Sequence, residues 1–148
     1  MRVVVINTGT EILLGDVLNT HLTFIAREIF PLGLRVERQI SVPDGTAIRD
    51  ALRENFGRAE IIFVTGGLGP TTDDITREIT AELLGLDLLA DPELENTITQ
   101  RLLTRGIRLT NRILRQAQVP RAAEVLPNEN GSAPGLYLAA NLNGSPTP

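Results

Sequence analysis

A short apolar run, Ile61 to Val64, leads directly into a glycine-rich turn at residues 65–72, and this feature constrains the fold more than any other part of the sequence. The run predicts a buried strand. Apolar residues that recur at helical spacing after the turn predict a helix over residues 73–84, which Gly85 ends. A strand, an open turn and a helix N-terminus in this order are typical of sites that bind phosphate. Residues 65–72 are called the glycine turn below.

Three carboxylates, those of Asp73, Asp74 and Glu78, follow the glycine turn. At about 4 Å and an effective dielectric constant near 20, one carboxylate beside one phosphate charge costs on the order of 4 kcal/mol. A divalent cation between the two removes this conflict, because hard cations bind carboxylate and phosphate oxygens together. The segment therefore predicts a site for a phosphorylated ligand together with Mg²⁺ or a similar metal.

The glycines leave the backbone of the turn open to a ligand, and the threonine hydroxyls beside them can donate hydrogen bonds to phosphate. The predicted phosphate-binding residues are Thr65, Gly66, Gly67, Gly69, Thr71 and Thr72. The Gly67-x-Gly69 spacing begins a dinucleotide-binding fingerprint, but Thr72 stands where its last glycine belongs. The alternative is a tight turn whose glycines serve only the backbone.

Each acidic candidate also has a purely structural interpretation. Thr71-x-x-Asp74 fits a capping box, in which the carboxylate only caps a helix. Glu78 follows Asp74 by four residues, so on a helix the two share a face and either grip a cation together or face solvent. Glu11, in a glycine-flanked loop, is a similar candidate. Asp44 is either a cap of the helix that follows it or part of the site.

Buried strands alternate with helices over the N-terminal part of the chain. The strands are predicted at residues 2–8, 34–42 and 60–65, and the helices at residues 17–30, 46–56 and 73–84. This alternation requires crossover connections and predicts a mostly parallel sheet with helices on both faces. Ligands bind such sheets beyond the carboxyl ends of the strands. At that edge a loop over residues 9–15, Asp44 and the glycine turn are expected to converge.

The rest of the chain carries weaker signals. A helix is predicted over residues 91–104, begun by Asp91 and Pro92, and a shorter one over 111–118; short strands are predicted at 86–90, 124–126 and 136–141. The loop at 127–135 contains Asn128 and Gly131, which are ordinary turn residues or part of a second loop that recognises phosphate or a ring. The arginines at 101, 105, 108, 112 and 115 form either a solvated helical stripe or contacts to phosphate or to an acidic neighbouring subunit.

The composition excludes several classes of site. There is no cysteine and His21 is the only histidine, which excludes disulfides, thiolate nucleophiles and a multi-histidine metal site within one chain. All 14 basic residues are arginine, which excludes a phosphate-loop lysine and Schiff-base chemistry. Carboxylates, hydroxyls, backbone amides and a recruited metal remain available for catalysis.

Charge and hydropathy set the expected partners and location. The net charge of −4 and the 3% aromatic content predict a chain that does not bind nucleic acid. No apolar run approaches the roughly 20 residues of a membrane span, and the N-terminus is typical of a strand rather than of a signal peptide. We expect a cytoplasmic protein with one domain over residues 1–144 and a tail at residues 145–148.

Several blocks of the sequence together resemble a known family. Thr65-Gly-Gly-x-Gly69, followed by Asp74-x-Thr76-x-Glu78, is similar to the signature of the molybdopterin-binding domain that the MogA/MoaB and CinA proteins share. Two further blocks resemble the CinA branch, the competence/damage-inducible proteins; they are Gly9-Thr10-Glu11-Ile12-Leu13-Leu14-Gly15 with Asn19-Thr20, and the asparagine-rich and Ala-Pro-Gly stretch at residues 127–135. The similarity spans about residues 2–143, in order.

The resemblance implies a three-layer α/β/α sandwich with a mostly parallel central sheet, and a pocket for molybdopterin-like or nucleotide pyrophosphate ligands. In the CinA branch it implies metal-dependent hydrolysis of ADP-ribose and related pyrophosphates. The acidic pair of the family falls on Asp44 and Asp74, which are the expected catalytic residues. Mg²⁺ or Co²⁺ is expected at Asp74, with Glu11 and Glu78 as further ligands. Further contacts to the small molecule are expected from Thr10, Asn128 and Gly131.

The resemblance also implies a homo-oligomer, as a dimer, trimer or hexamer. The alternative to hydrolysis is a non-catalytic module that binds molybdopterin or a nucleotide. Two departures from the family pattern concern the end of the chain: it stops at Pro148 before the family's Pro-Gly-x-Pro-x-Glu loop, and it lacks the C-terminal nicotinamide-mononucleotide deamidase domain. We therefore expect no deamidase activity and an incomplete wall of the pocket. Pro43 precedes Asp44 where glycine is common in the family.

Overall fold

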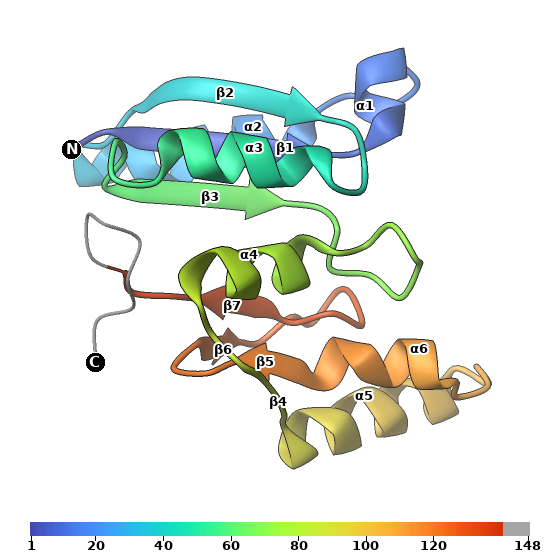
Figure 1. Ribbon diagram of the computed structural model, residues 1–148. Helices are drawn as coiled ribbons and strands as arrows, with labels where there is room; N and C mark the ends of the chain where they lie inside the picture. The colour runs from blue at the N-terminus through green and yellow to red at the C-terminus, as the bar shows by residue number, and fades with distance from the viewer. Residues whose placement is uncertain (141–148) are drawn as a thin grey trace.

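A parallel sheet of three strands forms one half of the molecule (Figure 1). The computed structural model describes residues 1–140 of the chain. In the order β2-β1-β3, the sheet is built from β1 (Val3–Thr8), β2 (Val36–Val42) and β3 (Ile61–Thr65). Both outer strands run parallel to β1, and Ile6 lies opposite Ile40 in β2 and Val64 in β3. The three predicted strands and their parallel arrangement are confirmed.

Helices lie on both faces of this sheet, as Figure 1 shows with α3 in front of it and α2 behind it. The helices of this half are α2 (Thr20–Ile29), α3 (Ala47–Asn55) and α4 (Thr76–Leu84). Ile48 and Leu52 of α3 and Ile79 of α4 are buried in one cluster with Val4 and Ile6 of β1. Full burial of such a side chain contributes about 1.5–3 kcal/mol. This cluster therefore fixes α3 and α4 against one face of the sheet.

The other half of the molecule contains short antiparallel strands and two helices, and Figure 1 shows α4 between these strands and the parallel sheet. The strand pairs are β4 (Leu88–Ala90) with β5 (Gln118–Pro120), and β6 (Glu124–Leu126) with β7 (Gly135–Tyr137). The helical segments are α5 (Pro92–Thr104), α6 (Asn111–Leu114) and the 3₁₀ turn η2 (Arg115–Ala117). Ile98 and Leu102 of α5 pack on Ala117 and form a second, smaller core.

The segment at residues 9–15, predicted as a loop, contains the helix α1 (Thr10–Leu14). A helix of five residues is too short to show apolar periodicity, and none of its residues is buried. The next helix begins at Thr20 instead of residue 17, because the Asn19 side chain caps it by accepting the Leu22 N–H at 3.1 Å. The helix α2 ends at Ile29, and the chain continues as the 3₁₀ turn η1 (Phe30–Leu32), which contains Pro31.

Other helix boundaries also differ from the predictions. The helix predicted from residue 73 begins at Thr76, because side chains at 71–74 bond within a turn. Asp44 does not cap α3, whose N-cap residue is Thr46 and has no side-chain capping bond. The helix predicted over 111–118 is divided into α6, η2 and the unpredicted strand β5. Residues 105–110 connect α5 to α6, so the five arginines of this region do not share one helix face.

The C-terminal predictions are only partly covered by the structure. The strand predicted over 136–141 corresponds to β7, which ends at Tyr137. The residue at 141, the end of the predicted domain at 144 and the predicted tail at 145–148 lie outside the described residues. Within residues 1–140, no helix is both long enough and apolar enough to cross a membrane.

Candidate functional site

The loops that follow β1, β2 and β3 leave the parallel sheet at the same edge, on the right-hand side of Figure 1. They carry Thr10 with Glu11, Asp44, and the glycine turn, in that order along the chain. At the ends of β1 and β3, the Asn7 side-chain amide donates a 2.6 Å hydrogen bond to the Thr65 hydroxyl. The predicted convergence of these three loops on one edge is therefore present.

The carboxylate of Asp44 joins the loop after β2 to the loop after β1. Its Oδ2 accepts the Thr10 backbone N–H at 2.9 Å, and its Oδ1 accepts the Thr8 hydroxyl at 3.3 Å. In return, the Asp44 N–H donates to the Thr10 hydroxyl at 3.3 Å. Asp44 thus holds the first turn of α1, whereas the sequence interpretation assigned its capping role to the following helix.

Glu11 is exposed on α1 at the same edge. Its carboxylate folds back over the preceding glycine, since a Cβ added to Gly9 would lie 2.5 Å from Glu11 Oε1. Gly9 therefore allows the Glu11 carboxylate to lie over the backbone between β1 and α1, where a side chain would exclude it.

The glycine turn packs tightly against β1 and α4. Gly66 and Gly67 have φ angles of 95° and 68°, a region that favours glycine. A Cβ on Gly66 would overlap the Thr8 carbonyl oxygen, and a Cβ on Gly67 would overlap the Thr76 hydroxyl. A Cβ on Gly69 would lie 2.5 Å from Asp74 Oδ2. These glycines therefore have a structural role as well, and their presence alone does not establish a phosphate site.

Asp73 and Asp74 share one hydrogen-bond donor. The Thr71 hydroxyl lies 2.6 Å from Asp73 Oδ1 and also within hydrogen-bond distance of Asp74 Oδ2, but it has a single proton and can serve only one of them at a time. The hydrogen bond from Thr71 lowers the pKa of Asp73. Asp74 Oδ2 also accepts the Thr71 N–H at 2.9 Å. Half of the predicted capping box is therefore formed, but within a turn that precedes α4. Thr72 is exposed in this turn.

Glu78 lies in an ion pair between two arginines. Its Oε1 accepts from Arg77 at 2.9 Å and from Arg115 at 2.7 Å, and the Arg77 side chain is only 2% exposed. Burial raises the pKa of Glu78, but hydrogen bonds from Arg115 and Arg77 lower it further, so that the net pKa lies below the ordinary value. Because α4 begins at Thr76, Asp74 and Glu78 do not share a helix face as predicted.

The predicted metal ligands are not assembled into a finished cage. Among residues 1–140, no group of three or more histidine or acidic side chains is arranged to hold a metal ion. The second oxygen of Glu78, Oε2, is buried and has no hydrogen-bond partner in this part of the chain. A hard cation prefers oxygen donors of this kind. Carboxylate oxygens are thus of the right chemical type for a hard cation, and the metal site stays a prediction.

Gln116 is a contact that the sequence analysis did not identify. It is 1% exposed in η2, and its Nε2 donates to the carbonyl oxygen of Leu68 in the glycine turn at 3.2 Å. Its Oε1 is buried without a partner among the described residues. No sequence signal links residues 48 positions apart, and Gln116 lay in a segment predicted only as a short helix. Only the tertiary structure brings it to the turn.

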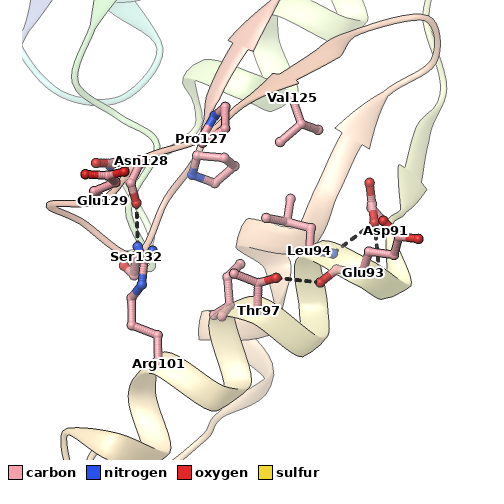
Figure 2. Close-up of a pocket in the computed structure, with 12 residues that line it drawn as sticks. Asp91, Glu93, Leu94, Thr97, Arg101, Val125, Pro127, Asn128, Glu129 and Ser132 are labelled. Carbon is pink, nitrogen blue, oxygen red and sulfur yellow. Dashed lines mark hydrogen bonds between the residues drawn. The ribbon is translucent and has the colours of Figure 1, made fainter.

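A cavity of about 280 Å³ lies between α5 and the β6–β7 loop, apart from the glycine turn (Figure 2). Asn128, one of the predicted ligand contacts, lines it. The Asn128 amide donates to the Ala133 carbonyl at 2.7 Å, and its oxygen accepts the N–H groups of Asn130 at 3.0 Å and Gly131 at 3.1 Å. Arg101 of α5 donates to the carbonyl oxygens of Asn128 and Gly131. Asn128 and Gly131 are thus brought together, but within their own loop.

The parallel β2-β1-β3 sheet with a glycine turn after β3 defines an α/β domain of the MogA/MoaB type. A solved MogA structure has a TM-score of 0.55 over 97% of this chain and 87% of that chain, at 19% identity, which supports the fold. The family described as "Probable molybdopterin binding domain" matches residues 4–140. The crystal structure of the protein CinA from Thermoplasma acidophilum has a TM-score of 0.84 and 34% identity, over 95% of this chain and 83% of that one. The chain belongs to this molybdopterin-binding-domain family, in its CinA branch.

A curated relative, the CinA-like protein of Akkermansia muciniphila, is 45% identical over 141 residues. The alignment covers 95% of this chain but only 34% of that protein. The chain therefore spans about a third of the length of such relatives, and the similarity concerns this domain alone.

Proposed function

We propose that this domain binds a nucleotide pyrophosphate together with a divalent cation and hydrolyses it, as an ADP-ribose-type pyrophosphatase. The observation that supports this proposal most is the meeting of three loops at the carboxyl edge of the sheet. Asp44 binds Thr8 and Thr10, and Gly66 packs on the carbonyl of the same Thr8. Acidic side chains and the backbone of the glycine turn thus share one edge, where α/β proteins bind ligands.

The hydrogen bonds already present decide which groups remain for phosphate. The Thr10 N–H is held by Asp44, so Thr10 would contact phosphate with its hydroxyl. The Thr65 hydroxyl accepts from Asn7 and keeps its own proton for a ligand oxygen. The backbone N–H groups of the glycine turn supply the remaining donors, which would stabilise negative charge that develops during hydrolysis.

Asp74 is proposed to hold the cation together with ligand oxygens. Glu11, exposed on the adjacent loop, and Glu78 Oε2, buried without a partner in the described residues, are the further candidates. A bound divalent cation supplies charge neutralisation and a more acidic water. Asp44 is proposed to keep Thr10 and the first turn of α1 in place while the phosphates bind.

The test is incubation of the chain with ADP-ribose and Mg²⁺ or Co²⁺, followed by chromatographic detection of AMP. Asp74→Asn is expected to lower turnover by about 100-fold or more while the fold is kept. Asp73→Asn is the matched control, because Asp73 is adjacent, exposed and bonded to the same Thr71 hydroxyl. Equal rates in the wild type and the Asp74 variant, or no AMP with either metal, would rule the proposal out.

The second candidate function is a module that binds molybdopterin or its adenylate without chemistry of its own. The description of the matching family favours it. Equilibrium titration with molybdopterin, followed by ligand fluorescence, tests this candidate. Binding without any release of AMP from a nucleotide pyrophosphate would favour it over hydrolysis.

We also propose that the chain forms a homo-oligomer. Apolar side chains are exposed on α1, on α2 and in the segment between them, among them Leu14 at 71%, Leu18 at 84% and Phe24 at 64%. A contiguous apolar patch marks an interaction site, and these neighbouring exposed side chains support the proposal on that ground. Light scattering coupled to size-exclusion chromatography would give a single monomeric mass if this proposal is wrong.

A further inference from the structure

The loop between β6 and β7 contains a pair of residues that can react with each other, Asn130 and Gly131. Glycine has no side chain, so its backbone nitrogen can approach the side-chain carbon Cγ of a preceding asparagine more closely than that of any other residue. One further pair of this kind, Asn143 and Gly144, lies outside the described residues. Every other asparagine of the chain precedes a residue with a side chain. Within residues 1–140, the pair at 130 and 131 is therefore the one with the least hindered attack.

The reaction is deamidation, and it requires no enzyme. The Gly131 nitrogen loses its proton and forms a bond to Asn130 Cγ, and the bond from Cγ to Nδ2 breaks, so that the side-chain nitrogen leaves as ammonia. Water then opens the cyclic imide at either carbonyl, which gives aspartate or isoaspartate at position 130. Asn130 is exposed, so water has access to the reacting atoms.

Asn128 holds the backbone on both sides of the reactive side chain. Its Oδ1 accepts the N–H of Asn130 at 3.0 Å and the N–H of Gly131 at 3.1 Å. The second bond engages the nitrogen that has to lose its proton and attack. Because one oxygen holds both N–H groups, it also opposes the backbone rotation at Asn130 that would bring this nitrogen to Cγ.

The loop is also held from outside. Asn128 Nδ2 donates to the Ala133 carbonyl at 2.7 Å, and Arg101 of α5 donates to the carbonyl oxygens of Asn128 and Gly131. Figure 2 shows Arg101 on α5 and Asn128 on the facing loop. Opening of the loop therefore breaks several hydrogen bonds together, and attack in the folded protein has to wait for such a local opening.

The same packing explains why glycine is needed at position 131. A Cβ added there would lie 2.8 Å from Asn128 Nδ2, closer than side-chain atoms pack. The absence of a side chain that makes the pair reactive is thus also what lets Asn128 lie against it. The fold keeps the reactive pair and restrains it by one neighbouring side chain.

We propose that Asn130 is a site of deamidation whose rate in the folded protein is controlled by the hydrogen bond from the Gly131 N–H to Asn128 Oδ1. The product carries a new carboxylate, and its isoaspartate form has a longer backbone in the loop that Arg101 holds. The reaction needs neither a ligand nor a metal. The inference therefore stands apart from the proposed function.

The experiment is incubation of the full chain at mildly alkaline pH, with and without enough urea to unfold it. Tandem mass spectrometry of proteolytic peptides measures the conversion at residue 130 and at residue 143 separately. In the folded wild type, conversion at residue 130 should be slower than in urea by about fivefold or more, the factor that one hydrogen bond of ordinary strength supplies. Asn130→Gln should abolish the signal at this position, because the longer side chain closes a ring less readily.

Two substitutions of Asn128 separate the single hydrogen bond from general loosening of the loop. Asn128→Ala removes the acceptor and should raise the rate in the folded protein by about fivefold, towards the rate in urea. Asn128→Asp is the matched control, because it keeps an oxygen acceptor for the Gly131 N–H and loses the donor to Ala133. It should keep a rate near that of the wild type.

Four results would overturn the inference. They are no conversion at residue 130 in urea, equal rates in folded and unfolded wild type, no acceleration in Asn128→Ala, and equal acceleration in both variants of Asn128. The comparison of the wild type with and without urea does not depend on how well a variant folds.

Discussion

Asp44 and Thr10 hold each other by two hydrogen bonds across 34 positions of sequence: the Thr10 N–H donates to Asp44 Oδ2 at 2.9 Å, and the Asp44 N–H donates to the Thr10 hydroxyl at 3.3 Å. The pair ties the loop after β2 to the loop after β1 at the carboxyl edge of the sheet. A carboxylate that the family resemblance marked as catalytic is therefore a structural tie in this fold, and experiments have to separate the two roles.

Two substitutions of Asp44 separate these roles. Asp44→Ala removes the acceptor of the Thr10 N–H and should lower the free energy of unfolding by about 1–2 kcal/mol, as loss of a cap does. Asp44→Asn keeps an oxygen acceptor and should lower the free energy of unfolding by less. If Asp44 is catalytic, both variants lose activity by a similar factor. Urea denaturation and AMP release measure the two effects, and activity that follows stability alone would assign Asp44 a purely structural role.

The tight packing of Gly66 makes a prediction about stability. Gly66→Ala places a methyl group against the Thr8 carbonyl oxygen and should destabilise the fold by about 2–4 kcal/mol, from strain of a positive φ plus overpacking. Gly85→Ala is the matched control, because Gly85 has a φ of 66° but no atom of the described part of the chain within 4 Å of an added Cβ. It should show only the cost of the positive φ, about 1–2 kcal/mol. If the two variants lose equal stability in thermal or urea denaturation, the result contradicts the close approach of Gly66 to the Thr8 carbonyl.

The lowered pKa of Glu78 predicts that the stability of the fold depends on pH. Because its folded pKa is lowered below the ordinary 4.5, its ion pair stabilises the fold above that pH and this contribution is lost as the pH falls through the folded value. At neutral pH, Glu78→Gln should lower the free energy of unfolding by about 2 kcal/mol, less than for a fully buried pair because the Glu78 side chain is 25% exposed.

The same variant should lose stability less steeply than the wild type in acid. Urea denaturation from neutral pH to about pH 3 measures the slope that linkage predicts. Glu124→Gln, on the exposed β6 position, is the control and should keep the wild-type slope. An unchanged slope in Glu78→Gln would show that the ion pair of Glu78 with Arg77 and Arg115 does not contribute to the pH dependence of stability.

Substitution of Gln116 should change the local stability of the glycine turn more than the global stability of the fold. Gln116→Met removes the bond to the Leu68 carbonyl, worth about 1 kcal/mol, and also removes the buried Oε1, which has no partner within residues 1–140, so the two terms nearly cancel. Amide hydrogen exchange in residues 66–70 should become faster while the unfolding midpoint changes little. Gln100→Met, exposed on α5, should change neither. If the amides of residues 66–70 in Gln116→Met exchange at the wild-type rates, Gln116 does not stabilise the glycine turn.

The parts of the fold that the sequence predicted are those with strong local signals. β1 is a continuous β-branched run and α5 begins with Asp91 and Pro92, and both elements form as expected. The predicted start of α4 was wrong by three residues, because Thr71 donates hydrogen bonds to the side chains of Asp73 and Asp74 in the preceding turn. Helix propensity does not report such competition between side-chain and backbone bonds.

The sequence by itself determined the parallel sheet and the edge at which a ligand would bind, because apolar periodicity and crossover connections are local and directional properties. It also identified the family. Only the tertiary structure decided that Asp44 holds Thr10, that Glu78 pairs with Arg77 and Arg115, and that Gln116 supports the glycine turn. Each of these bonds joins a polar side chain to a group that folding brings near, and the pattern of a single segment contains no information on which partner arrives.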